Sequence, residues 1–297
     1  MRVFVTGATG WIGASAVDEL LATGHTVLGL ARNEAAAAAL REKGAEALSG
    51  DLDDLDSLQR GARGADAVLH LANKHDWANP AESNRAERAA VQALADALVG
   101  SGKPFALASG LLRPETGRPA LETDASPAIG PDSLRGGSEN LALDYVDQGV
   151  RSIALRFAPT VHGVGDHGFI SQIVAAAQRT GVSGYVGDGR NAWAAVHRTD
   201  AARLARLALE QAPAGARLHA VAEEGIPTKV IAEAIADALG VKTTSIDPDD
   251  AVEHFGFIGR FFAADMTASS AATRAAYGWS PTGPTLVEDI VNGAYTK

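Results

Sequence analysis

The chain has no cysteine among its 297 residues, which excludes disulfides, thiolate nucleophiles and cysteine-ligated metals and fits a reducing compartment. No apolar run approaches the roughly 18 residues that a membrane-spanning helix needs. The apolar run at the N-terminus stops at Gly7, too early for a signal peptide. A net charge of −10 disfavours binding to nucleic acid or to an anionic membrane. We therefore expect a soluble, cytoplasmic protein whose partner is a small-molecule substrate.

The N-terminal half alternates between short apolar runs and longer helical patterns. Strands that alternate with helices of about 10–15 residues indicate βαβ units and a parallel sheet. The pattern predicts an α/β fold with a doubly wound parallel Rossmann sheet. The expected strands lie near residues 3–6, 26–31, 45–49, 67–71, 105–108 and 151–157, and the expected later helices near 54–60, 82–99 and 132–148.

After Pro159 the pattern changes. Glycine clusters at 163–168 and 184–189 bracket a predicted helix at 169–180, and Asp200 is the expected N-cap of a helix that runs to Gln211. A further strand is expected at 218–222. We expect residues 1–160 to form the dinucleotide-binding domain, with residues 191–222 returning to it. Residues 161–190 and 223–297 then form a smaller, mixed α/β C-terminal substrate lobe.

The clearest functional signal is a glycine motif that directly follows the first strand and opens a helix, as such a motif requires. It reads Thr6-Gly7-Ala8-Thr9-Gly10-Trp11-Ile12-Gly13. Gly7 allows a tight turn, Gly10 lets a pyrophosphate approach the backbone, and Gly13 lets the helix pack on the strand. Backbone N–H groups and the helix dipole then face the phosphates. We expect Gly7, Thr9, Gly10, Trp11, Ile12 and Gly13 to bind a dinucleotide.

The motif resembles the TGxxGxxG fingerprint of extended short-chain dehydrogenases, the group that contains NAD-dependent sugar epimerases and dehydratases. The resemblance continues through Gly50-Asp51-Leu52, His70-Leu71-Ala72, Arg156-Phe157-Ala158-Pro159 and Val196-His197-Arg198-Thr199-Asp200. It implies that Asp51 and Leu52 border the adenine. It also implies that Leu71, Ala72 and Asn73 run beside the pyrophosphate and ribose, and that Pro159 and Val161 lie near the nicotinamide.

The end of the second strand bears on the choice of cofactor. An NAD enzyme usually carries an acid there, whereas an arginine accommodates the 2′-phosphate of NADP. This chain has Ala31 followed by Arg32, and a guanidinium can bind a phosphate in a bidentate manner. We expect NADP(H), with NAD as the alternative, in which case Arg32 stacks over adenine or points into solvent.

Members of the resembled family usually carry a Tyr-x-x-x-Lys pair on the helix after strand five, but no tyrosine here has a lysine four residues later. Aligning Glu139 with the family's glutamate puts Arg135 in the lysine position and Pro131 in the tyrosine position. Arg135 could still bind ribose hydroxyls or phosphate, although a guanidinium stays protonated in proteins and cannot act as a base. The chain therefore resembles the atypical members of the group.

Other candidates for chemistry are Ser109, His162 and His167. Ser109 ends strand five, where the family usually keeps a serine that bonds the substrate oxygen; the alternative is a turn residue. His162 and His167 flank a glycine-rich loop expected near the reactive end of the cofactor, and a histidine there could donate a proton. Alternatively, both imidazoles bond backbone carbonyls. We expect no metal site, because there is no cysteine and no HExxH pattern.

Three functions follow from these observations. The first is an NADP(H)-dependent oxidoreductase acting on a small carbonyl, imine or alkene. The second is a non-catalytic NADP(H) sensor, suggested by the missing pair, and the third an epimerase or dehydratase. The few lysines in the middle of the chain argue against a nucleotide-sugar substrate, although Arg113, Arg118, Arg179 and Arg190 keep it open. The helices at 82–99 and 132–148 often form a dimer interface in the family. A homodimer is therefore expected. Gly136 and Gly137 weaken this expectation, because glycine is a poor helix former and both lie in the second of these helices.

Overall fold

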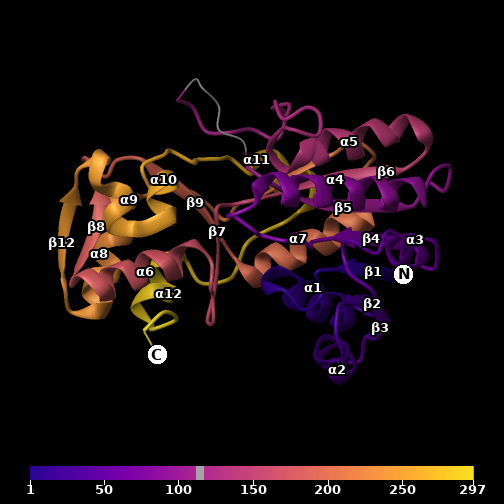
Figure 1. The fold of residues 1–297 in the computed structure, drawn as a ribbon, viewed down its shortest axis with the longest axis horizontal. Coiled ribbons are helices and arrows are strands. Elements are labelled where there is room, and N and C mark those ends of the chain that lie inside the picture. The colour runs from indigo at the N-terminus through magenta and orange to yellow at the C-terminus, as the bar shows by residue number, and fades with distance from the viewer. Residues whose placement is uncertain (112–116, 297) are drawn as a thin grey trace. The chain divides into compact units, whose positions relative to one another are not determined.

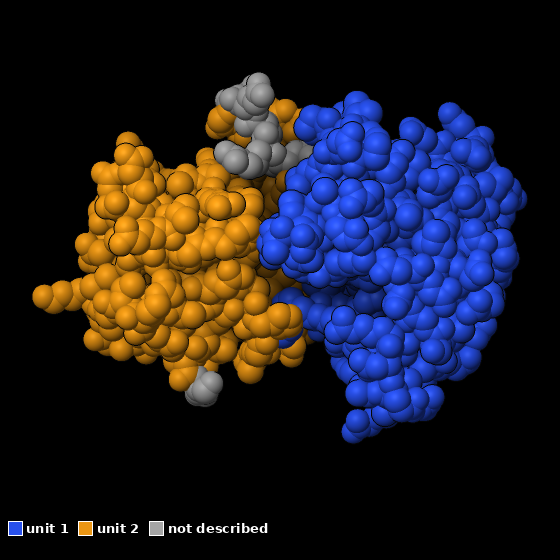
Figure 2. Space-filling model, in the orientation of Figure 1, with its two compact units in different colours: residues 1–109, 125–156, 202–218 blue, residues 110–124, 157–201, 219–297 orange. Residues whose placement is uncertain are grey.

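The computed structural model describes residues 1–111 and 117–296; Arg113 lies outside the described residues. The chain divides into two compact units (Figure 2). Unit 1 comprises Met1–Ser109, Ala125–Arg156 and Ala202–Leu218. Unit 2 comprises Gly110–Asp124, Phe157–Ala201 and His219–Lys297. Four segments fall differently from the expected division, since residues 110–124, 157–160, 191–201 and 219–222 belong to unit 2.

Unit 1 is built on a seven-stranded sheet with the strand order β10-β6-β5-β4-β1-β2-β3. The pairs β1–β2, β2–β3, β1–β4 and β4–β5 are parallel. This order confirms the predicted doubly wound Rossmann sheet. The strands are β1 (Arg2–Thr6), β2 (Thr26–Ala31), β3 (Glu46–Ser49), β4 (Ala67–His70), β5 (Pro104–Gly110), β6 (Arg151–Phe157) and β10 (Arg217–Ala220).

Helices cover both faces of this sheet, and Figure 1 shows α1 on one side and α4 and α5 on the other. On the first side Leu40 of α2 reaches Gly29 of β2, and Arg206 of α7 pairs with Glu19 of α1. The second side is filled by apolar residues of α3, α4 and α5 that pack on β1, β4 and β5. The helices are α1 (Trp11–Ala22), α2 (Glu34–Glu42), α3 (Leu55–Arg63), α4 (Pro80–Asp96), α5 (Ser138–Asp144) and α7 (Arg198–Gln211), with short 3-10 helices η1 (Leu134–Gly137) and η2 (Tyr145–Gln148) on either side of α5.

Unit 2 holds two small sheets, in the orders β11-β9-β7 and β12-β8. Its apolar core gathers around Trp193, whose ring contacts Phe169 and Phe262. The strands are β7 (Thr160–His162), β8 (Val182–Val186), β9 (Ala192–His197), β11 (Glu223–Pro227) and β12 (Lys242–Ile246). The helices are α6 (Phe169–Thr180), α8 (Thr228–Leu239), η3 (Pro248–Asp250), α9 (Ala251–Phe255), η4 (Gly256–Ile258), α10 (Gly259–Phe262), α11 (Ala271–Tyr277) and α12 (Leu286–Val291).

Two expected elements differ from the structure. The helix predicted over 132–148 is divided into η1, α5 and η2, so one of the two helices behind the homodimer expectation has only seven residues. Asp200 is not an N-cap, because α7 already begins at Arg198. Its carboxylate instead accepts hydrogen bonds from the backbone N–H groups of Thr282 and Gly283, 3.0 and 2.8 Å away. Asp200 therefore holds the C-terminal segment rather than the start of its own helix.

The turn before α5 is left-handed over three successive residues. Arg135, Gly136 and Gly137 have φ values of 54°, 61° and 64°. A Cβ on Gly136 would lie 2.5 Å from the carbonyl oxygen of Asn84, so that position excludes other residues by sterics as well as by φ. Arg135 is a non-glycine residue in this region and stores backbone strain at the position that the sequence aligned with the family's lysine.

We expect Gly136→Ala to destabilise unit 1 by about 2–4 kcal/mol, since the left-handed conformation and the clash with Asn84 add up. The matched control is Gly24→Ala, where φ is 83° but no atom lies within 4 Å of the new Cβ; it should cost only about 1–2 kcal/mol. Denaturant unfolding measures both. Equal losses in the two variants would contradict the close contact at Gly136.

Candidate functional site

The glycine turn between β1 and α1 is packed so closely that Gly7 and Gly13 cannot carry a side chain. Gly7 has a φ of +66°, and a Cβ there would lie 2.8 Å from the backbone nitrogen of Ala72. A Cβ on Gly13 would lie 1.9 Å from the carbonyl oxygen of Gly7. That same carbonyl accepts a hydrogen bond from the N–H of Gly10 at 2.9 Å. The turn is thereby held against the first turn of α1 and against the loop that follows β4.

The N-terminus of α1 has the features of an anion site. Gly10 is its N-cap, no side chain caps it, and its first turn carries no acidic residue. The first N–H groups of a helix have no partner inside the helix and carry partial positive charge. Thr9 and Gly10 are exposed, and Trp11 and Ile12 are half-buried. The residues present therefore fit a bound phosphate or diphosphate.

The residues expected at the adenine side follow β2 and β3. Arg32 comes directly after β2 and is exposed, and within the described residues it forms no hydrogen bond or ion pair. Asp51 follows β3 and accepts hydrogen bonds from the N–H groups of Asp53 and Asp54, which fixes the loop of half-buried Leu52. Arg32 is thus available to an anion, whereas Asp51 shapes the loop through its own backbone.

Leu71, Ala72 and Asn73 follow β4, and all three are partly exposed. The hydroxyl oxygen of buried Thr6 bonds His70 at 2.7 Å and accepts the N–H of Ala72 at 3.3 Å. Burial lowers the pKa of His70, and the charge of Arg135 lowers it further, against the opposing effect of Glu87. A neutral His70 therefore holds the Thr6 hydroxyl, which in turn bonds the loop after β4.

Arg135, which the sequence aligns with the family's lysine, forms an ion pair with Glu87 of α4. Its Nη2 lies 2.6 Å from Glu87 Oε1, and 27% of the Arg135 side chain is exposed. Burial alone would raise the pKa of Glu87. The charge of Arg135, and hydrogen bonds from Arg135 and Asn73, outweigh burial and hold that pKa below its usual value. Glu87 is therefore a buried carboxylate that stays charged.

Ser109 at the end of β5 belongs to a second polar network. Its hydroxyl donates to Glu139 Oε2 at 2.6 Å. Glu139 is paired with fully buried Arg156, whose Nη2 and Nε lie 2.6 and 3.1 Å from its two carboxylate oxygens. Ser109 is half-buried, so its hydroxyl oxygen can still accept a hydrogen bond while its proton is engaged.

His162 lies in unit 2, inside the protein rather than at an open surface. Its Nδ1 lies 2.6 Å from Asp289 Oδ2 of α12, and its side chain is fully buried. Burial lowers the pKa of His162 despite the carboxylate of Asp289. His197 is near, with its Nε2 3.9 Å from the same Asp289 oxygen. His162 is thus a neutral imidazole that anchors α12 to β7, and the half-buried Val161 precedes it.

His167 is the more accessible of the two candidate histidines. It is exposed, next to half-buried Asp166, which accepts hydrogen bonds from Gly168 N–H and from Tyr295 Oη at 2.6 and 2.8 Å. Burial raises the pKa of Asp166, and burial together with Asp166 raises the pKa of Tyr295. Half-buried Pro159 lies between β6 and β7.

The sequence did not identify Glu87 or Asp289 as site residues. Both are long-range partners, Glu87 being 48 positions from Arg135 and Asp289 being 127 from His162. No local spacing reports such pairs; the signal available was a lone acid on the core-facing side of a predicted helix. Tyr145 has a different role from a catalytic tyrosine. It donates to Asp96, and burial and that bond raise its pKa to about 12.

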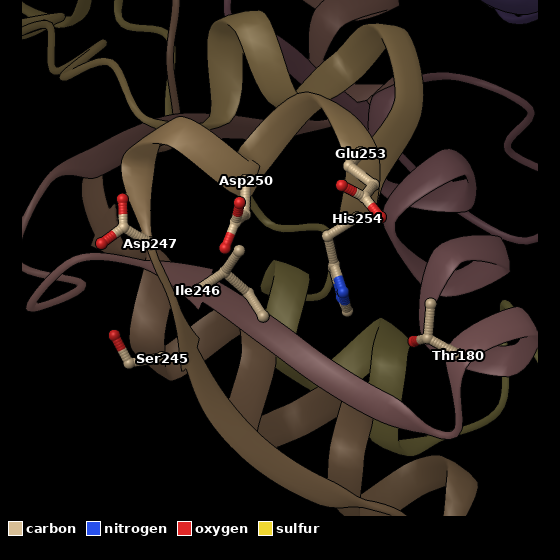
Figure 3. A pocket seen from close by; sticks show the side chains of 7 residues that line it. All are labelled: Thr180, Ser245, Ile246, Asp247, Asp250, Glu253 and His254. Atoms are coloured by element: carbon tan, nitrogen blue, oxygen red, sulfur yellow. The ribbon is translucent and has the colours of Figure 1, made fainter.

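Unit 2 also has a hollow of about 370 Å³ between α6, β12 and α9 (Figure 3). It contains none of the predicted site residues. It is lined by Thr180, Ser245, Ile246, Asp247, Asp250, Glu253 and His254. Within residues 1–111 and 117–296 there is no cluster of three histidine, aspartate or glutamate side chains suited to a metal ion. In the same part of the chain no helix has the length and apolar character to span a membrane.

Comparison with known proteins identifies the family. Residues 3–222 match the model of the NAD dependent epimerase/dehydratase family, and the chain belongs to that family. An uncharacterized protein of Saccharomyces cerevisiae is 44% identical over 294 residues, which cover 98% of each chain. The 4-hydroxy-2-methyl-3-oxo-4-farnesyl-3,4-dihydroquinoline-1-oxide ketoreductase of Stigmatella aurantiaca is 29% identical over 72% of this chain and 66% of its own. UDP-glucose 4-epimerase of Thermotoga maritima, solved with UDP-glucose, superposes with a TM-score of 0.79 over 99% of this chain and 98% of its own; at 18% identity this shows the fold.

The lowered pKa of His70 predicts how stability depends on pH. Below about pH 6.5 the unfolded chain protonates this histidine while the folded chain does not, so its contribution to stability is present above that pH and is lost as the pH falls. We expect the unfolding temperature to fall from about pH 7.5 to about pH 6, and to fall less in His70→Gln. The pKa values of Asp166 and Glu223 are raised, so these two groups stabilise the folded protein as the pH falls. Their effect is the same in the wild type and in His70→Gln, and it does not change the comparison.

The control for this measurement is Gln59→Ala, which removes an uncharged, half-buried side chain of α3 and should keep the wild-type slope. A His70→Gln variant with the same slope as wild type would contradict a neutral, buried His70.

Proposed function

We propose that this protein is an NADP(H)-dependent oxidoreductase that reduces or oxidises a small carbonyl, imine or alkene substrate. The observation that carries the proposal is the glycine turn at 7–13. Its backbone packing is incompatible with side chains at Gly7 and Gly13, and the helix N-terminus beside it has no capping side chain and no acid. The similarity to a ketoreductase and the membership of an NAD-dependent family support the same reading.

The cofactor would be held by the edge of the sheet where β1, β2 and β4 end. The N-terminus of α1 would take the diphosphate, and Arg32 the 2′-phosphate. Leu71, Ala72 and Asn73 would lie along the half that extends over β4. When bound, the cofactor supplies or accepts the hydride.

The proton would come from a group other than a Tyr-x-x-x-Lys pair. Ser109 can accept a hydrogen bond from a substrate hydroxyl, or exchange its own proton between Glu139 and substrate oxygen. His167 is the exposed histidine, whereas buried His162 is better suited to holding the loop of Gly163 in place through Asp289. Arg135 would bind ribose hydroxyls or phosphate rather than move a proton.

A second candidate is a sensor that binds NADP(H) without turnover. The observation in its favour is that Ser109, Arg135 and His162 are each bonded to an internal carboxylate. An epimerase or dehydratase is less favoured, because such chemistry also uses the tyrosine that this sequence does not pair with a lysine. Turnover with bound cofactor separates the enzyme from the sensor.

Replacing Arg32 with alanine should weaken NADPH binding by about 10- to 100-fold, because hydrogen bonds to a charged group contribute about 1.5–3 kcal/mol. NADH has no 2′-phosphate, so its dissociation constant should change little. Calorimetric titration of both nucleotides measures the difference. The proposed preference would be overturned by a wild-type protein that binds NADH as tightly as NADPH, or by an Arg32→Ala variant that loses both equally.

Oxidation of NADPH against a panel of ketones, aldehydes, imines and activated alkenes tests the activity. We expect Ser109→Ala to lower kcat by about 10- to 1,000-fold, as is typical when a positioned acid–base or hydrogen-bonding group is removed. His167→Ala and Arg135→Ala are measured beside it, with Gln59→Ala as a half-buried control on α3. Turnover that none of the first three substitutions changes would remove the assignment of these residues, and no turnover with tight NADPH binding would favour the sensor.

A further inference from the structure

One carboxylate in unit 1 joins two of the segments proposed to bind the dinucleotide. Glu87 is 1% exposed in the middle of α4. Its Oε1 accepts from Arg135 Nη2 at 2.6 Å, and its Oε2 accepts from Asn73 Nδ2 at 2.9 Å. Each oxygen therefore fixes a donor from a different element, one from the left-handed turn before α5 and one from the loop after β4.

The loop end of this connection reaches the glycine turn. Asn73 follows Ala72, whose backbone nitrogen would be 2.8 Å from a Cβ on Gly7. Asn73 is itself oriented by two bonds, because its Oδ1 accepts the N–H of His75 at 2.8 Å while its Nδ2 donates to Glu87. Glu87 thus orients the Asn73 side chain next to the loop backbone that borders the glycine turn.

At the other end of this connection, Arg135 has N–H donors that the bond to Glu87 does not use. The bond to Glu87 uses Nη2 of Arg135, and 27% of that side chain is exposed, so its other N–H groups can face a ligand. The turn that carries Arg135 is fixed as well. Arg88 Nη1 donates to the carbonyl of Gly136 at 2.7 Å, and the N–H of Arg135 donates to Asn84 Oδ1 at 3.0 Å. Helix α4 therefore sets both the backbone and the guanidinium of Arg135.

The order of the strands indicates which half of a dinucleotide Arg135 would meet. The sheet runs β5-β4-β1-β2, so the glycine turn after β1 lies between Arg32 after β2 and Asn73 after β4. With the diphosphate at the turn and the adenosine 2′-phosphate at Arg32, the second nucleoside extends over β4. Glu87 and Arg135 are on that side.

We propose that Glu87 is a positioning residue that holds Arg135 and Asn73 against the nicotinamide-side half of the bound dinucleotide. The proposal rests on the proposed function. Among the described residues, Arg135 is the cation that pairs with the buried carboxylate of Glu87, since His70 Nε2 is 3.9 Å away on a neutral ring. The pair thus orients a guanidinium at the position that the sequence aligned with the family's lysine.

Glu87→Gln tests this, because glutamine keeps the shape and removes the charge. Binding of two probes is measured by calorimetry: NADPH, which contains both nucleosides, and adenosine 2′,5′-bisphosphate, which contains only the adenine side. We expect NADPH to bind about tenfold or more weakly, as for the loss of a charge-assisted contact. The bisphosphate should bind as it does to wild type. The matched control is Glu82→Gln on the same helix, where the carboxylate is 55% exposed and both probes should bind normally.

If Glu87→Gln folds poorly, the Arg135→Gln variant tests the same proposal. It leaves an N–H donor for Glu87 and should show the same selective loss of NADPH. The double variant should then lose less NADPH affinity than the two single losses added together, because both substitutions break the same ion pair. Equal weakening of both probes in Glu87→Gln, unchanged NADPH binding, or additive losses in the double variant would each overturn the proposal. A wild-type protein that binds neither probe would overturn the proposed function, and this role of Glu87 with it.

Discussion

The close approach of the backbone at residues 7, 13 and 72 is the constraint on which the rest of unit 1 depends. A side chain on Gly13 would meet the carbonyl of Gly7 at 1.9 Å, and one on Gly7 would meet Ala72 at 2.8 Å. The first helix therefore begins against the end of its own strand and next to the loop of the neighbouring parallel strand. This packing places the N-terminus of α1 at the carboxyl edge of the sheet, where ligands bind in open α/β folds.

Around that edge the protein places charges that balance one another inside unit 1. Glu87 is paired with Arg135, and Glu139 with Arg156, while His70 is held neutral by burial. Removing one partner of a buried pair leaves an uncompensated charge, which is costly. The networks therefore fix the loop after β4, the end of β5 and the turn before α5. Unit 2 uses the same principle, since the bond between His162 and Asp289 fastens α12 to β7.

Much of the fold followed from local pattern. The strands β2 and β6 and the helix α6 have the bounds that the sequence predicted, because β-branched runs and helical periodicity were bounded there by clear turn residues. The prediction of one helix over 132–148 was wrong. Helical periodicity does not report backbone conformation, and Gly136 and Gly137 both adopt a positive φ that interrupts the helix. The role of Asp200 was missed because its partners, Thr282 and Gly283, are 82 and 83 positions away.

The candidate site divides in the same way. Its glycine turn is a local motif and was predictable residue by residue, and so was the position of Arg32 after β2. The polar partners were not, because Glu87 and Asp289 acquire their roles only when distant elements pack together. Whether Ser109 faces a substrate or Glu139 likewise depends on tertiary packing, and no spacing in the sequence reports it.

The central claim is that the turn at residues 7–13 grips the diphosphate of a pyridine dinucleotide. A crystal structure of the protein soaked with NADPH tests it most directly. The account predicts density for the diphosphate at the N-terminus of α1, within hydrogen-bond distance of backbone N–H groups, about 2.7–3.2 Å, with the 2′-phosphate beside Arg32. Density for the nucleotide at any other place in the chain, or none at saturating concentration, would contradict it.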